Sequence, residues 1–413
     1  MKAIFKQTLL AITCGSALFL TACNDDDNKD NWGSNKDYVS ESAYNLGRMP
    51  GAESIKVMTY NMPYVLGGTK KATAMVFVPK TKRPTDGWKV VVWGHGTVGV
   101  GDSCAPSRNE INDRFKPMAE SLLKEGYVIL APDYEGLGTP GMHPYLNLKS
   151  EANSAIYAVK AYKERYGNQI NGQWMSVGQS QGGQASLGTA EFSNTDSNYK
   201  GAVAGAPASS LGQIIADVAP KAIQNILLEE QKGEKPVGTA AGVYATLLTY
   251  TSFAVVGVTA YEPKFNYRDV FKERSKSIVA LAEGSTGENG LCFVDLQKKF
   301  VDDINDYTAK NAGKTVLDYP GLIDNFQENP TLKKFLEDNQ PATKRINTPV
   351  MIIQGTADTS VPYTVTDKLQ KDLKAMGTDV TFLAVKDATH TGAIIAKNTE
   401  LVEFIKKHMP TTK

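Results

Sequence analysis

Short apolar runs alternate with amphipathic stretches along most of the chain. The strands that we predict from apolar runs occupy residues 54–60, 73–79, 89–93, 127–133, 174–177, 201–207, 348–354 and 380–385. The helices that we predict, mainly from apolar residues three and four positions apart, occupy residues 114–125, 151–166, 184–190, 365–376 and 398–408. This alternation predicts an α/β fold with a mostly parallel central sheet flanked by helices.

The alternation stops between residues 210 and 344, where helical patterns dominate. Residues 211–230 are amphipathic, and Pro220 is expected to kink or divide that helix. Residues 242–261 are almost all apolar or small, which predicts a buried or lipid-facing cap helix. A membrane span is the alternative, but Gly257 and several Thr and Ser residues disfavour it. We therefore predict an α/β core in two parts, residues 41–209 and 345–413, with an inserted helical cap, or lid, at 210–344.

The first residues have the pattern of a targeting signal. A basic start is followed by a short apolar run, and Leu20-Thr21-Ala22-Cys23 resembles a bacterial lipobox. This predicts a lipoprotein signal peptide over residues 1–22, lipidation of Cys23, and a location in the bacterial cell envelope. By resemblance to sorted bacterial lipoproteins, Asn24 directly after Cys23 favours the outer membrane. The alternative is an ordinary signal peptide in which Cys23 is incidental.

The segment after the signal, residues 23–40, is rich in Asn and Asp and nearly free of apolar residues, which predicts a flexible tether. An acidic calcium loop is the alternative, but the run lacks the spacing of such a loop.

Composition limits the partners. The 413 residues are 41% hydrophobic and 22% charged, with a formal net charge of +1. The chain has no basic block, so we expect no nucleic-acid partner. We expect a monomer whose partners are a small-molecule or lipid ester and, through the lipid, a membrane. No motif indicates a metal or an organic cofactor.

The sequence Gly178-Gln179-Ser180-Gln181-Gly182-Gly183 lies between a predicted strand and a predicted helix. A G-x-S-x-G motif in this context is typical of a nucleophile elbow, a sharp turn that exposes the serine oxygen above a sheet. Flanking glycines are needed because side chains there would collide with the neighbouring strand and helix. Ser180 is therefore the predicted nucleophile.

A serine hydroxyl needs a base and a carboxylate that orients the base. Asp358 and His390 each follow a predicted strand, and the chain order Ser, Asp, His is that of an α/β-hydrolase. We predict Asp358 as the acid and His390 as the base. Asp387 is the rival acid but is better explained as a turn residue. His95 is the alternative base, though we expect it to pack in a loop.

Two backbone N–H groups are predicted to stabilise an oxyanion. One belongs to Gln181, directly after the nucleophile, and the other to Thr97 in the Gly-rich loop after residues 89–93. Gly96 or Val98 could present the second amide instead of Thr97.

The predicted location in the cell envelope indicates what the four cysteines do. Cys14 would leave with the signal peptide and Cys23 would be lipidated, which leaves Cys104 and Cys292 in an oxidising space. We expect a disulfide between them, the alternative being two buried free thiols.

Several motifs together resemble those of the secretory lipase family, the group of Candida antarctica lipase A. They are His95-Gly96-Thr97, Cys104-Ala105-Pro106-Ser107, Asp133-Tyr134-Glu135-Gly136-Leu137-Gly138, His143-Pro144-Tyr145, the Ser180 motif and Gly355-Thr356-Ala357-Asp358. The resemblance implies an α/β-hydrolase fold with a helical cap, esterase or lipase activity, a Ser–Asp–His triad, and the Cys104–Cys292 pairing. The lipobox departs from the fungal members, which are secreted free.

These observations predict a serine carboxylesterase or lipase that acts on lipid-like or medium-chain esters through an acyl-enzyme. Acyl transfer to an alcohol would use the same triad. Peptidase activity is disfavoured because the chain has no propeller-like extra domain. A surface lipoprotein that binds a ligand on an inactive hydrolase scaffold is the non-enzymatic alternative.

Overall fold

The computed structural model describes residues 37–412, and nine strands form one sheet within them. The strands are β1 Tyr38–Ala43, β2 Ala52–Pro63, β3 Thr69–Pro79, β4 Trp88–Gly94, β5 Tyr127–Pro132, β6 Ile170–Gln179, β7 Tyr199–Gly205, β8 Val350–Gly355 and β9 Val380–Val385. Their order in the sheet is β1-β2-β3-β5-β4-β6-β7-β8-β9. The pairs from β5 to β9 are parallel, and those among β1, β2, β3 and β5 are antiparallel. The predicted α/β-hydrolase class, with its mostly parallel sheet, is confirmed.

The sheet has a switch point between β4 and β6. The chain passes from β4 to β5 on one side and then returns to place β6 on the other side of β4. Ligands of open α/β sheets bind beyond the carboxyl ends of strands at such a point. The Gly-rich loop after β4 and the Ser180 turn after β6 both begin there.

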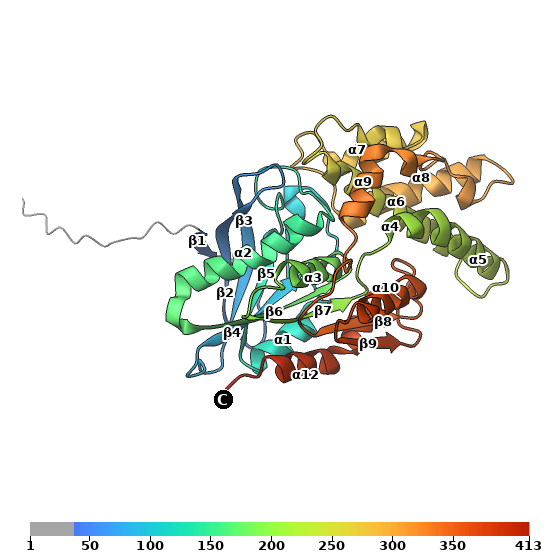
Figure 1. The fold of residues 1–413 in the computed structure, drawn as a ribbon. Coiled ribbons are helices and arrows are strands. Elements are labelled where there is room, and N and C mark those ends of the chain that lie inside the picture. The colour runs from blue at the N-terminus through green and yellow to red at the C-terminus, as the bar shows by residue number, and fades with distance from the viewer. Residues whose placement is uncertain (1–36, 413) are drawn as a thin grey trace, which may run out of the picture. The chain divides into compact units, whose positions relative to one another are not determined.

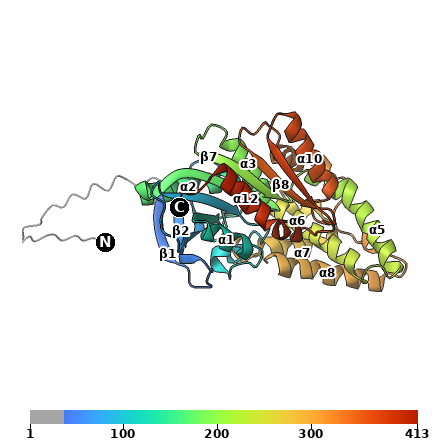
Figure 2. The same ribbon diagram turned by 90° about the horizontal axis from the view of Figure 1, so that it is seen from below.

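Helices cover both faces of the sheet, as Figures 1 and 2 show. The helices on one face are α2 Leu148–Tyr166, α3 Gln181–Phe192 and α10 Tyr363–Ala375, and those on the other are α1 Lys116–Lys124, α11 Gly392–Ala396 and α12 Asn398–His408. The inner strands β4, β5 and β8 are buried along their whole length, as their continuous apolar runs require.

Helices also make up the segment between β7 and β8, which has its own apolar core. They are α4 Leu211–Gln213, α5 Ala219–Gln231, α6 Thr239–Val258, α7 Glu273–Glu283, α8 Phe293–Lys310 and α9 Pro330–Asp338. We keep the name cap for residues 210–344. The predicted helix is divided just before Pro220, as expected. Helix α4 and a π-helical stretch, Ile214–Val218, come first, and α5 then begins at Ala219. Pro220 lies in the first turn of α5, where its missing N–H costs little.

Helix α6 is, within residues 37–412, the one helix long and apolar enough to cross a membrane. Most of it is nevertheless buried inside the protein, since 72% of its apolar window is covered. It packs on α5, α7 and α8. This burial favours the interpretation of α6 as a core helix of the cap.

The predicted tether boundary at residue 40 is wrong. Strand β1 begins at Tyr38 and pairs antiparallel with β2. The backbone N–H groups of Asp37 and Tyr38 also donate to Glu164 Oε2, both at 2.9 Å. The strand is mostly exposed and polar, so hydrophobicity could not reveal it. The predicted signal peptide, the lipidation of Cys23 and most of the tether lie outside the described residues.

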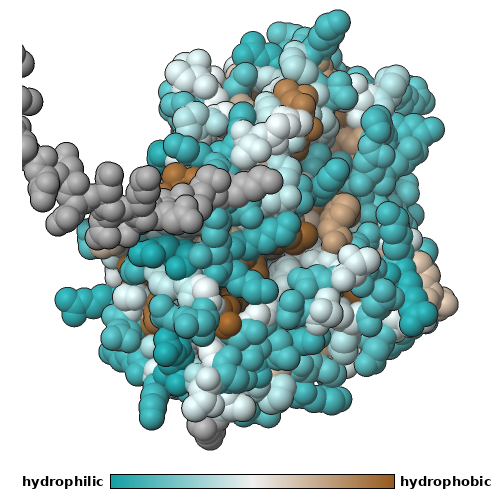
Figure 3. All heavy atoms as spheres, turned by 60° about the vertical axis from the view of Figure 1, so that its left-hand side comes forward, coloured by the Kyte–Doolittle hydropathy of each residue, from teal (hydrophilic) through white to brown (hydrophobic). Residues whose placement is uncertain are grey.

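The face of the molecule seen in Figure 3 is mostly hydrophilic. Apolar residues reach the surface there in small, separate groups. Isolated apolar side chains on a surface are ordinary, so this face suggests no large docking surface.

Candidate active site

Ser180 lies at a strained turn between β6 and α3. Its φ and ψ angles are 60° and −118°, a positive φ that few residues other than glycine adopt. The turn is held by its own backbone, since Ser180 N–H donates to Gly205 O at 2.8 Å and Ser180 O accepts from Gln184 N at 3.0 Å. Strain that the surrounding chain enforces is the geometry of a nucleophile elbow.

The glycines around Ser180 allow backbones to touch. A Cβ on Gly182 would stand 1.8 Å from Gly94 O, and a Cβ on Gly178 would stand 1.9 Å from Gly182 O. These contacts are possible only without side chains. They press the first turn of α3 against the ends of β4 and β6, which positions both Ser180 and the Gly-rich loop.

Asp358 and His390 form a largely buried, hydrogen-bonded pair beside this turn. Nδ1 of His390 lies 2.7 Å from Oδ2 of Asp358, which has a fully buried side chain. The other carboxylate oxygen, Oδ1, accepts backbone N–H groups from Ser360 at 2.8 Å and Val361 at 2.9 Å. Gln354 Nε2 adds a donor to Oδ2 at 3.0 Å. The carboxylate is thus fully hydrogen-bonded and can hold one tautomer of the imidazole.

The free nitrogen of His390, Nε2, is buried and has no hydrogen-bond partner within the described chain. No hydrogen bond joins it to the Ser180 hydroxyl in this structure. The two residues are nevertheless linked through Gln179, which precedes Ser180 and donates from Nε2 to His390 O at 3.0 Å. Catalytic hydrogen bonds are often open in a ligand-free enzyme and close when substrate binds.

The two predicted oxyanion donors lie at the switch point. Gln181 is the first residue of α3, so its N–H has no acceptor within the helix. Within residues 37–412, neither this N–H nor that of Thr97 donates to another group of the chain. Gly96 lies against residue 179, because its Cβ would stand 3.1 Å from Gln179 Oε1. The loop that carries Thr97 is therefore next to the nucleophile.

The alternatives to the predicted base and acid make other contacts. His95 is buried, with its ring nitrogens near Gly96 O at 2.7 Å and Asp133 O at 3.3 Å, and burial lowers its pKa to about 4. Asp133 accepts from Thr73 Oγ1 and from the backbone of the loop after β4. Asp387 is exposed in a turn with φ 55°.

Sequence reasoning missed a buried polar network beneath the oxyanion site. Gln181 Nε2 donates to Glu151 Oε1 at 2.7 Å and lies 3.1 Å from His143 Nε2. Burial raises the pKa of Glu151 to about 8 and lowers that of His143 to about 3. Leu146 N–H also donates to Glu151 Oε1, at 3.0 Å. The one sequence signal was Glu151 itself, a carboxylate on an otherwise apolar helix face.

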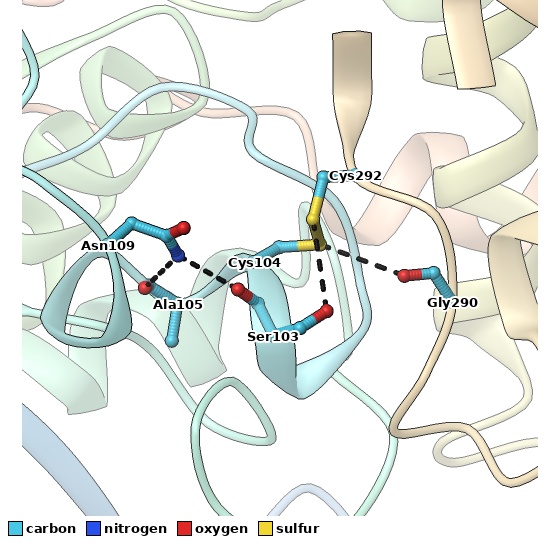
Figure 4. Close-up of a disulfide and its surroundings, with 6 residues drawn as sticks. All are labelled: Ser103, Cys104, Ala105, Asn109, Gly290 and Cys292. Atoms are coloured by element: carbon cyan, nitrogen blue, oxygen red, sulfur yellow. Dashed lines mark hydrogen bonds between the residues drawn. A yellow bond between two sulfur atoms is a disulfide. The ribbon is translucent and has the colours of Figure 1, made fainter. Parts of the chain in front are cut away.

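The Cys104–Cys292 disulfide is present and joins the core to the cap (Figure 4), with a Cα–Cα distance of 5.5 Å. Cys104 ends a short 3₁₀ turn after the Gly-rich loop, and Cys292 caps α8. Phe293 N–H donates to Val98 O at 2.8 Å, next to Thr97. The disulfide therefore ties the cap to the predicted oxyanion loop.

The cap also comes close to the predicted triad through Tyr250 of α6. Burial is the main influence on the Tyr250 hydroxyl and raises its pKa. A hydrogen bond with Ser360 and the charge of Arg114 lower this pKa, whereas the charge of Asp358 raises it. These influences indicate that Tyr250 lies near both Asp358 and Arg114. Within residues 37–412, no group of three or more His, Cys, Asp and Glu side chains is arranged to hold a metal ion.

Comparisons with known proteins agree with this fold. A model of the prolyl oligopeptidase family matches residues 297–411, which include Asp358 and His390. No curated protein matches the chain. Among solved structures, the rice cell wall degrading esterase LipA from Xanthomonas oryzae has 16% identity and a TM-score of 0.62, over 91% of this chain and 98% of that one. Candida antarctica lipase A in its closed state has 15% identity and a TM-score of 0.63, over 92% and 84%.

The chain thus has the α/β-hydrolase fold. The strained serine, the buried Asp–His pair and the comparisons together support a serine hydrolase as its class.

Proposed function

We propose that the protein is a serine carboxylic-ester hydrolase, a lipase or carboxylesterase, that works through an acyl-enzyme on Ser180. The observation that carries this proposal is the buried Asp358–His390 pair, whose free Nε2 faces no other partner within the described chain. In the proposed reaction His390 takes the proton of Ser180 as the serine oxygen attacks the ester carbonyl. His390 then returns the proton to the leaving alcohol.

The oxyanion that forms would be stabilised by the N–H groups of Gln181 and Thr97. Water, activated by the same His390, would then release the acid. Apolar side chains of α6 and α9 in the cap lie against Leu146 of the core, which supports lipid-like or medium-chain acyl groups as substrates.

The test is hydrolysis of p-nitrophenyl esters from acetate to palmitate by the protein expressed without its first 23 residues. Wild type should turn over, and Ser180→Ala should lose at least about 10³-fold in kcat/KM. Ser186→Ala is the matched control, since Ser186 is a buried serine of α3 whose hydroxyl lies 2.8 Å from Ser176 Oγ in β6. Equal activity of Ser180→Ala and wild type would refute the proposal.

A peptidase is the second candidate, because the matching family model is that of prolyl oligopeptidases. Peptide p-nitroanilides distinguish the two: an esterase cleaves the esters only, whereas a peptidase also cleaves the anilides. An acyltransferase would form product esters when alcohols are added. A non-catalytic ligand-binding lipoprotein would cleave none of these substrates.

The same proposal includes a location. We expect cleavage before Cys23, lipidation of that residue, and a monomer held at the cell envelope by its lipid. Cys23→Ser should move the protein from the membrane fraction to the soluble fraction. Unchanged membrane association of this variant would exclude Cys23 as the anchor.

A further inference from the structure

A pocket of about 280 Å³ opens beside the proposed oxyanion site. It is bounded by the Gly-rich loop, by Gln179 and by the cap residues next to the disulfide. Its apolar walls are formed by Met75, Trp93, Val98, Ile111, Phe115 and Phe293. The exposed Val294 marks its rim. Its volume is just below the usual range for small-molecule sites, about 300–1,000 Å³, so it suits a small ligand.

Arg114 is the one cationic side chain among the pocket's lining residues. Its Nη1 donates to Gln179 Oε1 at 3.1 Å, and within residues 37–412 it forms no ion pair with a carboxylate. Burial lowers the pKa of the guanidinium, which nevertheless stays charged at any ordinary pH. A partly buried cation without a counter-ion is costly, and an incoming anion would offset that cost.

The position of Arg114 connects it to the reaction. The Gln179 side chain accepts from Arg114 through Oε1 and donates to His390 O through Nε2. Gln179 is also the residue before Ser180. A group bound at Arg114 therefore lies one side chain away from the triad.

Other charges near the pocket do not replace the missing counter-ion. Glu110 also lines the pocket but is exposed, at its rim. Asp358 is already hydrogen-bonded by His390, Gln354 and two backbone N–H groups. His95, the one histidine that lines this pocket, is neutral at physiological pH because burial lowers its pKa to about 4.

We propose that this pocket binds a carboxylate attached to a medium-length apolar chain, with the carboxylate on Arg114 and the chain along the apolar walls. Resting on the proposed ester hydrolysis, this assigns a substrate class: esters in which one half carries a free carboxylate. The planar guanidinium suits a carboxylate because it can donate two parallel hydrogen bonds.

Binding tests the pocket independently of catalysis. Calorimetry with octanoate and with octan-1-ol should show tighter binding of octanoate, and Arg114→Gln should weaken octanoate binding by about tenfold or more, as expected for a hydrogen bond to a charged group. Arg114→Lys keeps the positive charge but cannot donate two parallel hydrogen bonds, so its affinity for octanoate should lie between those of wild type and Arg114→Gln. Arg108→Gln is the matched control, because Arg108 is an exposed arginine of the same segment that already faces Asp102. Equal affinity for octanoate and octan-1-ol, or no change in Arg114→Gln, would overturn the proposal.

Kinetics test the substrate class. We expect the ratio of kcat/KM for mono-p-nitrophenyl suberate over p-nitrophenyl octanoate to fall about tenfold or more in Arg114→Gln and to stay constant in Arg108→Gln. Circular dichroism of both variants checks their folding. If neither ester is cleaved by wild type while octanoate still binds through Arg114, the proposed hydrolysis fails and the binding site stands. If both esters are cleaved with an unchanged ratio, the hydrolysis stands and the substrate class fails.

Discussion

The residue with the most hydrogen-bond donors around it in this site is Asp358. Four donors converge on its two oxygens, and one of them is Nδ1 of His390. A carboxylate held this way fixes the orientation of the imidazole and leaves Nε2 free to accept a proton. Its role in the reaction stays a prediction that a conservative substitution can test.

Asp358→Asn should lower kcat by about 10⁴-fold, because an amide favours the wrong imidazole tautomer while leaving the fold intact. Steady-state kinetics on a p-nitrophenyl ester measure the loss. Asp387→Asn is the matched control. It changes the rival carboxylate at φ 55°, a conformation that asparagine tolerates well, so activity should remain. The opposite pattern would reassign the triad acid.

Glu151 makes a pH-dependent contribution to stability. Its Oε2 and the Oε1 of its partner Gln181 are both buried without a partner in the described chain, and a proton on Oε2 would supply the missing donor. Burial raises the pKa of Glu151 from 4.5 to about 8. Between these values the folded state keeps a proton that the unfolded chain has lost, so the free energy of unfolding falls as pH rises.

Glu151→Gln should remove this fall, because glutamine is neutral at every pH and keeps the shape of the protonated acid. Urea unfolding of both proteins at pH 5, 6.5 and 8 should show the variant gaining stability over wild type as pH rises. The neighbouring His143, Tyr134 and Tyr145 are the same in both proteins and cancel in the comparison. Parallel pH profiles would show that Glu151 does not carry this proton.

At the scale of elements, the site depends on how closely α3 approaches the ends of β4 and β6. Helix α3 begins directly at the nucleophile, and its glycines let the helix backbone touch both strands. The strain at Ser180 persists because these contacts leave the turn no room to relax.

Gly182→Ala should destabilise the protein by about 3 kcal/mol or more, since the added carbon meets backbone rather than a movable side chain. Thermal or urea unfolding measures the loss. Gly242→Ala, in α6, is the control. A Cβ there meets nothing within 4 Å, so this change should stabilise the protein by about 0.5–1 kcal/mol. Similar losses in both variants would mean that the close approach is not the cause.

At the scale of the whole molecule, the cap and the core are connected around the site. The disulfide closes a sequence separation of 188 residues and lies beside the loop that carries Thr97. A crosslink over so long a loop restricts the unfolded chain strongly in the chain-entropy model.

Cys104→Ser and Cys292→Ser should each lower the free energy of unfolding by about 2–5 kcal/mol. The double variant should lose no more than either single one, because all three remove the same crosslink. Unfolding of wild type with and without dithiothreitol gives an independent comparison. Stability that is insensitive to reductant would show that the disulfide is absent from the protein in solution.

Much of the fold follows from local patterns in the sequence. Continuous apolar runs of strand length specify the inner strands, because a parallel strand is buried on both faces. The bounds of β9 and α12 agree with the patterns in the sequence. The strand–turn–helix context singles out Ser180, and the order of Asp358 and His390 after it narrows the acid and base to a few candidates.

Tertiary structure decided what depends on residues far apart in the sequence. Strand β1 is too polar to be recognised by its own pattern and is defined by its pairing with β2. The buried network of Glu151 with Gln181 and the uncompensated charge of Arg114 beside Gln179 exist only because separate elements meet at the switch point. Local hydrophobicity indicates which side of a helix or strand is buried. It does not indicate which polar group of another element will contact that side, so these features could be identified only in the folded chain.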